Sequence, residues 1–146
     1  MNFIKTILIT LTMLACLVVS ALASTPNPTP NSPGYEVLIF SINKQYTATT
    51  AGVVRFKMPW PAKLVTVQAA ARASGGTTPT LTVDVKEAGT SKLTSAVTVT
   101  AGSVAEAAIG TTPRIADEAV ITVDLTIGGT TPTWDDITVI MVVKRL

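Results

Sequence analysis

The chain has 146 residues, with 11 basic and 9 acidic side chains, no histidine and one cysteine, Cys16. About 123 residues lie beyond an apolar N-terminal segment, which is enough for one domain. Because histidine is absent and Cys16 lies within that segment, zinc sites, His-based triads, cysteine nucleophiles and disulfide frameworks are excluded. Without Lys5 of the same segment, the chain has ten basic and nine acidic residues. This near-balance of charge argues against a nucleic-acid partner.

Residues 1–23 have the layout of a secretory signal peptide. Lys5 supplies the positive charge, residues 7–19 form an uncharged apolar stretch, and residues 21–23 (Ala-Leu-Ala) form a small-x-small cleavage site. The apolar run is about 17 residues long, near the lower limit for spanning a bilayer, so a retained membrane anchor is the alternative. We therefore predict export to an extracellular, virion or cell-surface location, with membrane contact only if residues 1–23 are retained.

Residues 24–34, STPNPTPNSPG, form a Pro-rich linker. Its four prolines remove backbone donors and favour extended backbone, so the linker cannot be helical and buries nothing. A semi-rigid spacer and a disordered mature N-terminus are equally compatible with this composition.

Apolar and polar residues alternate in short Val/Ile/Thr-rich runs over residues 35–146, and no long helical stripe is present. The pattern predicts an all-β domain, a two-sheet antiparallel sandwich of the jelly-roll type. The expected strands are 36–42, 54–58, 63–72, 80–86, 92–99, 104–109, 121–125 and 137–144. The side chains expected inside are Leu81, Val83, Val85, Ile121, Val123, Leu125, Val54 and Phe56.

The motif GGTTPT occurs twice, at residues 75–80 and 128–133. Glycine supplies positive φ and proline fixes φ where the chain re-enters a strand, so each copy is predicted to be a hairpin connection. Both are expected at the same end of the sandwich, which makes that end the first candidate for a binding surface.

The last predicted strand, 137–144, is apolar on both faces, because Ile140 and Val142 alternate with a second apolar set. A central strand covered on both sides would explain this pattern, and so would a subunit interface. We favour self-association.

Three segments resemble the small β-sandwich modules of tailed-phage virion proteins, found in fibre heads, neck fibres and decoration proteins. They are FKMPWPAKLV (56–65), LTVDVKEAGTS (81–91) and VITVDL (120–125). The resemblance covers the chain from about residue 56 to the C-terminus and implies a non-catalytic virion subunit that forms trimers, as fibre heads do. The signal-like N-terminus departs from those modules.

Two carboxylates, Asp84 and Asp124, occupy matching places in their strands. Such a pair can act as acid and base on a glycosidic bond, but outward-facing residues beside threonines and Lys86 are better explained as a solvated strand face. No other base and no paired nucleophile is available, so we predict no enzymatic activity.

The candidate ligand-binding residues lie around the second GGTTPT copy and at the Pro-Trp-Pro turn: Trp134, Asp135, Asp136, Thr130, Thr131 and Trp60. An exposed Trp134 beside carboxylates suits carbohydrate recognition, whereas a ring that anchors a loop is the structural alternative. Acidic pairs in loops also suit Ca²⁺, but the ligand run of a calcium loop is absent, so no metal and no cofactor are predicted.

The sequence thus favours a non-catalytic structural or attachment module on a virion or cell-surface assembly. It would act as a homo-oligomer, with cell-surface glycans or other virion or surface proteins as partners. The alternative is a secreted carbohydrate-binding module that acts as a monomer through Trp134.

Overall fold

The computed structural model describes residues 34–111 and 113–146. The predicted signal peptide or anchor (1–23) and residues 24–33 of the linker lie outside them. The described part is all-β, and none of its residues forms a helix that could cross a membrane. Its strands are β1 (Tyr35–Ile42), β2 (Thr50–Lys57), β3 (Ala62–Glu87), β4 (Thr90–Ser91), β5 (Val97–Val99), β6 (Val104–Ala107), β7 (Arg114–Ile115) and β8 (Val120–Arg145).

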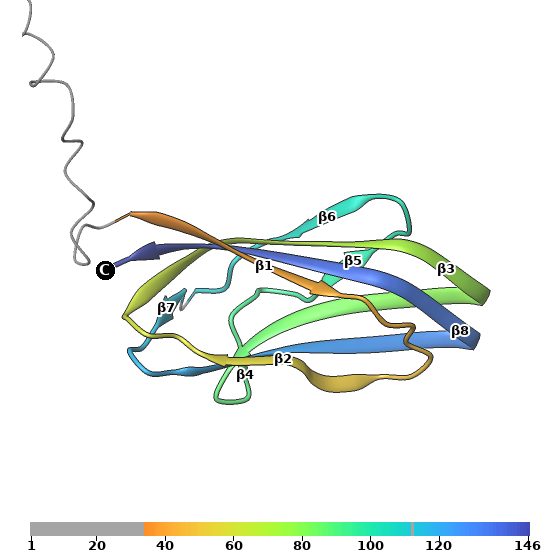
Figure 1. Ribbon diagram of the computed structural model, residues 1–146, viewed down its shortest axis with the longest axis horizontal. Helices are drawn as coiled ribbons and strands as arrows, with labels where there is room; N and C mark the ends of the chain where they lie inside the picture. The colour runs from red at the N-terminus through yellow and green to blue at the C-terminus, as the bar shows by residue number, and fades with distance from the viewer. Residues whose placement is uncertain (1–33, 112) are drawn as a thin grey trace, which may run out of the picture. The chain divides into compact units, whose positions relative to one another are not determined.

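Strands β3 and β8, 26 residues each, organise the domain. They pair antiparallel from Ala62 opposite Arg145 to Glu87 opposite Ile121, and they bend together at one end of the domain (Figure 1). The bend divides one continuous sheet into two layers, ordered β1-β8-β3-β6 and β2-β8-β3-β5. In this pairing order, that of a jelly roll, β3 and β8 each serve as one strand in both layers. The predicted two-sheet antiparallel sandwich is therefore confirmed.

The two GGTTPT copies are corners and not hairpin connections, which corrects the sequence prediction. Each copy runs inside one continuous strand, and the two copies pair with each other, Gly75 opposite Thr133 and Thr80 opposite Gly128. Register shifts at 75–80 and positive φ at Gly76 and Gly129 let both strands turn without changing partner. The expectation that both copies lie at the same end of the sandwich is confirmed.

The core lies between the two layers and is filled by alternate residues of β3 and β8. Six of the eight side chains expected inside are fully buried: Leu81, Val83, Val85, Ile121, Val123 and Leu125. Val54 and Phe56 are only partly buried, because their strand β2 lies at the edge of its layer and pairs with β8 alone. The Phe56 ring packs on Phe40 of β1, with ring centroids 5.2 Å apart, and so joins the two layers at their edges.

The predicted strand at 92–99 is mostly irregular, and only Val97–Val99 forms β5. The side chain of Lys92 is buried, where it pairs with Glu87 and donates to the carbonyl oxygen of Arg114 at 2.9 Å. These side-chain bonds, with an isolated bridge from Leu93 to Ile109, hold the segment in place of ladder pairing. The strand expected at 104–109 is likewise shorter, Val104–Ala107.

Candidate functional site

The outer face of the β1-β8-β3-β6 layer is apolar at its centre. Val37 of β1 lies opposite Val142 of β8, and Ile39 lies opposite Ile140. Val37 and Ile39 are 58% and 62% exposed, while the alternating residues of β8 (Ile137, Val139, Met141 and Val143) are fully buried in the core. Strand β8 therefore has two apolar faces, as predicted, and only the inner one is covered within the described chain.

The same outer face extends further with exposed apolar side chains on the neighbouring strands. Tyr35 of β1 and Val104 of β6 are both 67% exposed, and Val65 of β3 is exposed as well. Isolated exposed apolar residues are ordinary, but a contiguous group on one sheet face marks an interaction surface. We call the group Tyr35, Val37, Ile39, Val65, Ile140 and Val142 the apolar outer face, and Val104 lies apart from it on the same side of the sheet, beyond Thr138 and Gln68.

Charged residues flank the apolar outer face. Lys63 and Lys144 lie opposite each other on β3 and β8, and the Lys144 Nζ is 5.8 Å from the centroid of the Tyr35 ring. Further along the face, Glu106 of β6 accepts hydrogen bonds from Thr66 Oγ1 at 2.6 Å and from the Gln68 side chain. These two hydrogen bonds hold the pKa of Glu106 below its ordinary value, so this carboxylate is ionised at neutral pH.

The structure places the predicted ligand residue Trp134 inside the protein. Its side chain is only 2% exposed, and its backbone exchanges hydrogen bonds with Tyr46, at 2.8 and 2.9 Å. The expectation of an exposed ring is therefore wrong, and the alternative of an anchoring aromatic residue describes the structure. Trp134 lies on β8 directly after the corner, out of phase with the buried residues Ile137 and Val139 that follow it, where an isolated bridge pairs its backbone with Tyr46.

The remaining candidates at the corner are exposed or engaged by neighbours. Thr130 and Thr131 are exposed, whereas Asp135 accepts a hydrogen bond from Gln45 at 3.0 Å and Asp136 one from Arg72 at 2.6 Å. The structure thus gathers the candidate residues 130–136 on one strand.

Trp60 is not part of that group. It precedes the first residue of β3, at the opposite end of the strand from the corner, and its half-buried ring stacks on the Arg145 guanidinium, 3.7 Å from the ring centroid. Trp60 and Trp134 do not form one aromatic site.

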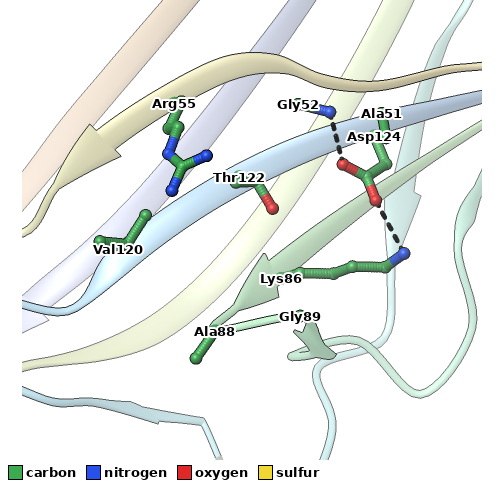
Figure 2. A pocket seen from close by; sticks show the side chains of 9 residues that line it. All are labelled: Ala51, Gly52, Arg55, Lys86, Ala88, Gly89, Val120, Thr122 and Asp124. Atoms are coloured by element: carbon green, nitrogen blue, oxygen red, sulfur yellow. Dashed lines mark hydrogen bonds and ion pairs between the residues drawn. The ribbon is translucent and has the colours of Figure 1, made fainter.

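A shallow hollow lies on the outer face of the other layer, lined by residues of β2, β3 and β8 (Figure 2). Asp124, one of the two carboxylates considered from the sequence, lines the hollow, and the other, Asp84, lies directly opposite Asp124 on β3. The Lys86 ammonium donates to Asp124 at 2.7 Å and lies 3.9 Å from Asp84. The sequence did not indicate the third contact, a hydrogen bond of 2.7 Å from the backbone N–H of Gly52 to Asp124.

The electrostatics of the hollow favour the ionised form of Asp124. Burial raises the pKa of Asp124, but the hydrogen bonds from Lys86 and Gly52, together with the Lys86 charge, outweigh burial and leave the pKa below its ordinary value. Asp84 accepts a further bond from Ser91 Oγ at 2.6 Å. A carboxyl group with a lowered pKa does not serve as a general acid at neutral pH, so Asp124 is not suited to that role.

No family model and no curated protein matches this sequence. Among solved structures, the chain is similar to a chain of the cyanophage Pam1 capsid asymmetric unit. The TM-score is 0.52 and the sequence identity 21%, and the alignment covers 86% of this chain and 96% of that one. At this identity the similarity shows the fold.

Proposed function

We propose that this protein is a non-catalytic structural subunit of a phage virion, which assembles with further copies of itself through the apolar outer face. The observation that carries the proposal is the exposure of Val37 and Ile39 opposite Ile140 and Val142. Covering an apolar face of this kind is favourable by about 25 cal/mol for each Å² removed from water. In a monomer this apolar face would stay in contact with water, without the stabilisation that burial gives, and would be prone to non-specific association.

The fold similarity supports a virion role over other structural roles. The comparable chain belongs to a capsid, and the similarity spans nearly all of it. The resemblance to fibre heads implies three copies, and other virion proteins or a host-surface glycan are the expected further partners. Location on the virion follows from this proposal, and export through residues 1–23 stays a prediction.

The chemistry of the charged hollow supports a non-catalytic role. The hydrogen bonds from Lys86 and Gly52 keep the pKa of Asp124 below its ordinary value, so this carboxylate is not poised to donate a proton to a substrate, and Asp84 accepts a hydrogen bond from Ser91. Two carboxylates held in this way stabilise the strand pairing around them.

The second candidate, a carbohydrate-binding module, rests on the exposed hydroxyl groups of Thr130 and Thr131 at the corner. Its main support from the sequence, an exposed Trp134, is lost because that ring is buried. The remaining groups provide hydrogen bonds but no aromatic platform for a sugar ring, so this candidate is the weaker one.

Light scattering coupled to size exclusion distinguishes the two candidates. We expect the purified chain to have the mass of several copies at tens of micromolar, and a Thr130→Ala, Thr131→Ala double variant to retain that mass. A strict monomer that binds a glycan, and loses the glycan in the double variant, would instead establish the carbohydrate-binding module.

A further inference from the structure

Strand β1 has an open edge. Among the described residues β1 pairs only with β8, and the Arg145 N–H donates to the Gly34 carbonyl at 3.0 Å. Along an antiparallel strand, the N–H and C=O groups of successive residues point alternately toward the partner strand and away from it. Because Gly34 bonds to Arg145, the even-numbered residues of β1 are the ones that bond to β8. The N–H and C=O groups of the odd-numbered residues, Tyr35, Val37, Ile39 and Ser41, therefore point away from the sheet.

This edge lacks the features that keep edge strands apart. It is eight residues long, YEVLIFSI, with no proline, and its single charge, Glu36, is paired with Arg145 at 2.6 Å. The edge strand of the other layer, β2, is protected: a register shift between Thr50 and Val54 interrupts its pairing, and the exposed side chains of Arg55 and Lys57 flank it. The remaining edge strands, β5 and β6, have only three and four residues, so β1 is the edge best suited to pairing with another strand.

We infer that β1 pairs with β1 of a second copy, antiparallel, about a two-fold axis at Leu38. This register sets Val37 against the partner's Ile39 and Tyr35 against the partner's Ser41. Every outward backbone group of β1 then finds a partner, and the β1-β8-β3-β6 layers of two copies become one sheet. The inference rests on the self-association proposed above and adds a second contact to it, because edge pairing lies in the plane of the sheet and leaves the apolar outer face free for further copies.

A second copy fits this edge better than the chain's own linker does. The strand is self-complementary in the stated register, because exposed apolar side chains meet each other and Glu36 meets the partner's Phe40, so no like charges face one another. Residues 24–33 carry Asn, Thr, Ser and Pro side chains, which would leave Val37 and Ile39 poorly covered. The edge is also continuous with the apolar outer face, since Tyr35, Val37 and Ile39 belong to both.

Proline at position 37 tests the inference. The Val37 N–H points to the open edge, so Val37→Pro removes no hydrogen bond within the chain but blocks pairing across the edge. Val37→Thr is the matched control, because it keeps the N–H and the β-branched shape. We expect light scattering at tens of micromolar to show an even number of copies for the natural chain and for Val37→Thr, and half that number for Val37→Pro.

A cross-link provides a second measurement that does not depend on the proline variant folding. In this register Leu38 lies on the two-fold axis, opposite Leu38 of the second copy, as a non-hydrogen-bonded pair with a Cα separation of about 4.5 Å, which a disulfide can span. With Cys16→Ser as background, we expect Leu38→Cys to form a disulfide-linked dimer under mild oxidation, and Asn43→Cys, just beyond the strand, to form none.

Other outcomes overturn the inference and separate it from the proposed function. An assembly of three copies that persists in Val37→Pro, with no cross-link at position 38, overturns edge pairing and leaves the structural role standing. A monomer overturns both. If that monomer also protects the Val37 amide from hydrogen exchange, residues 24–33 of the same chain cover the edge.

Discussion

Asp84 and Asp124 lie directly opposite each other on neighbouring strands, and Lys86 is within 3.9 Å of the first and 2.7 Å of the second. Like charges at such positions destabilise a sheet unless a cation lies between them. The ion pairs therefore allow two carboxylates to face each other across the β3-β8 pair in the layer that contains β2.

This arrangement predicts a loss of stability in acid. The pKa of Asp124 is lower in the folded protein than its ordinary value of 3.8, so its contribution is fully present above that pH and is lost as the pH falls through the folded-state pKa. Urea unfolding at pH 7 should show Asp124→Asn to be less stable than the natural chain, and the difference should shrink towards pH 2.5. Asp117→Asn, at an exposed turn, should behave as the natural chain at both pH values. A difference that stays constant with pH would contradict the assignment.

The corner glycines are predicted to be intolerant of a side chain. Gly129 has φ +112°, and a Cβ there would lie 2.7 Å from the carbonyl oxygen of Thr78. Gly102 has a similar φ, +75°, but open space around it. Gly129→Ala should lower the free energy of unfolding by about 2–4 kcal/mol and Gly102→Ala by about 1 kcal/mol, as measured by urea unfolding. Equal losses would show that the two strands are not in close contact at the corner.

Trp134 is predicted to stabilise the fold. Its buried ring fills the core beside the corner, so Trp134→Ala should cost about 3–5 kcal/mol of unfolding free energy. Trp60→Ala should cost less, because the Trp60 ring is half exposed. A loss under about 0.5 kcal/mol for Trp134→Ala would instead indicate an exposed ring, as the carbohydrate-binding alternative requires.

Alternation in the sequence was sufficient to predict the fold class and most of the core. It predicted the inward residues of β3 and β8 because both strands are central and their buried side chains repeat every second position. Alternation does not show whether a Gly-rich break reverses the chain or bends it. The GGTTPT segments were therefore misread as hairpin connections, since whether a strand keeps its partner through the break depends on contacts far apart in sequence.

The two candidate surfaces differed in how far the sequence could define them. The apolar outer face was foreseen in part, through Ile140 and Val142, because an apolar residue at an outward position stands out from the alternation. The contributions of Val37 and Ile39 emerge only from the pairing of β1 with β8. Trp134 was misplaced because its neighbours, GGTTPT and two aspartates, are typical of a loop, whereas the residue itself lies in a strand.

The mass of an Ile140→Lys variant in solution tests the central claim most directly. Ile140 lies at the centre of the apolar outer face on β8, whose backbone is bonded to β1 on one side and β3 on the other, so the substitution adds a charge to the face and leaves both pairings intact. Thr98→Lys places the same charge on an exposed strand position of the other layer and is the control. We predict that light scattering at tens of micromolar shows several copies for the natural chain and for Thr98→Lys, and a smaller assembly for Ile140→Lys with unchanged thermal unfolding. An Ile140→Lys variant with the natural mass, or a natural chain that is a monomer, would contradict assembly through this face.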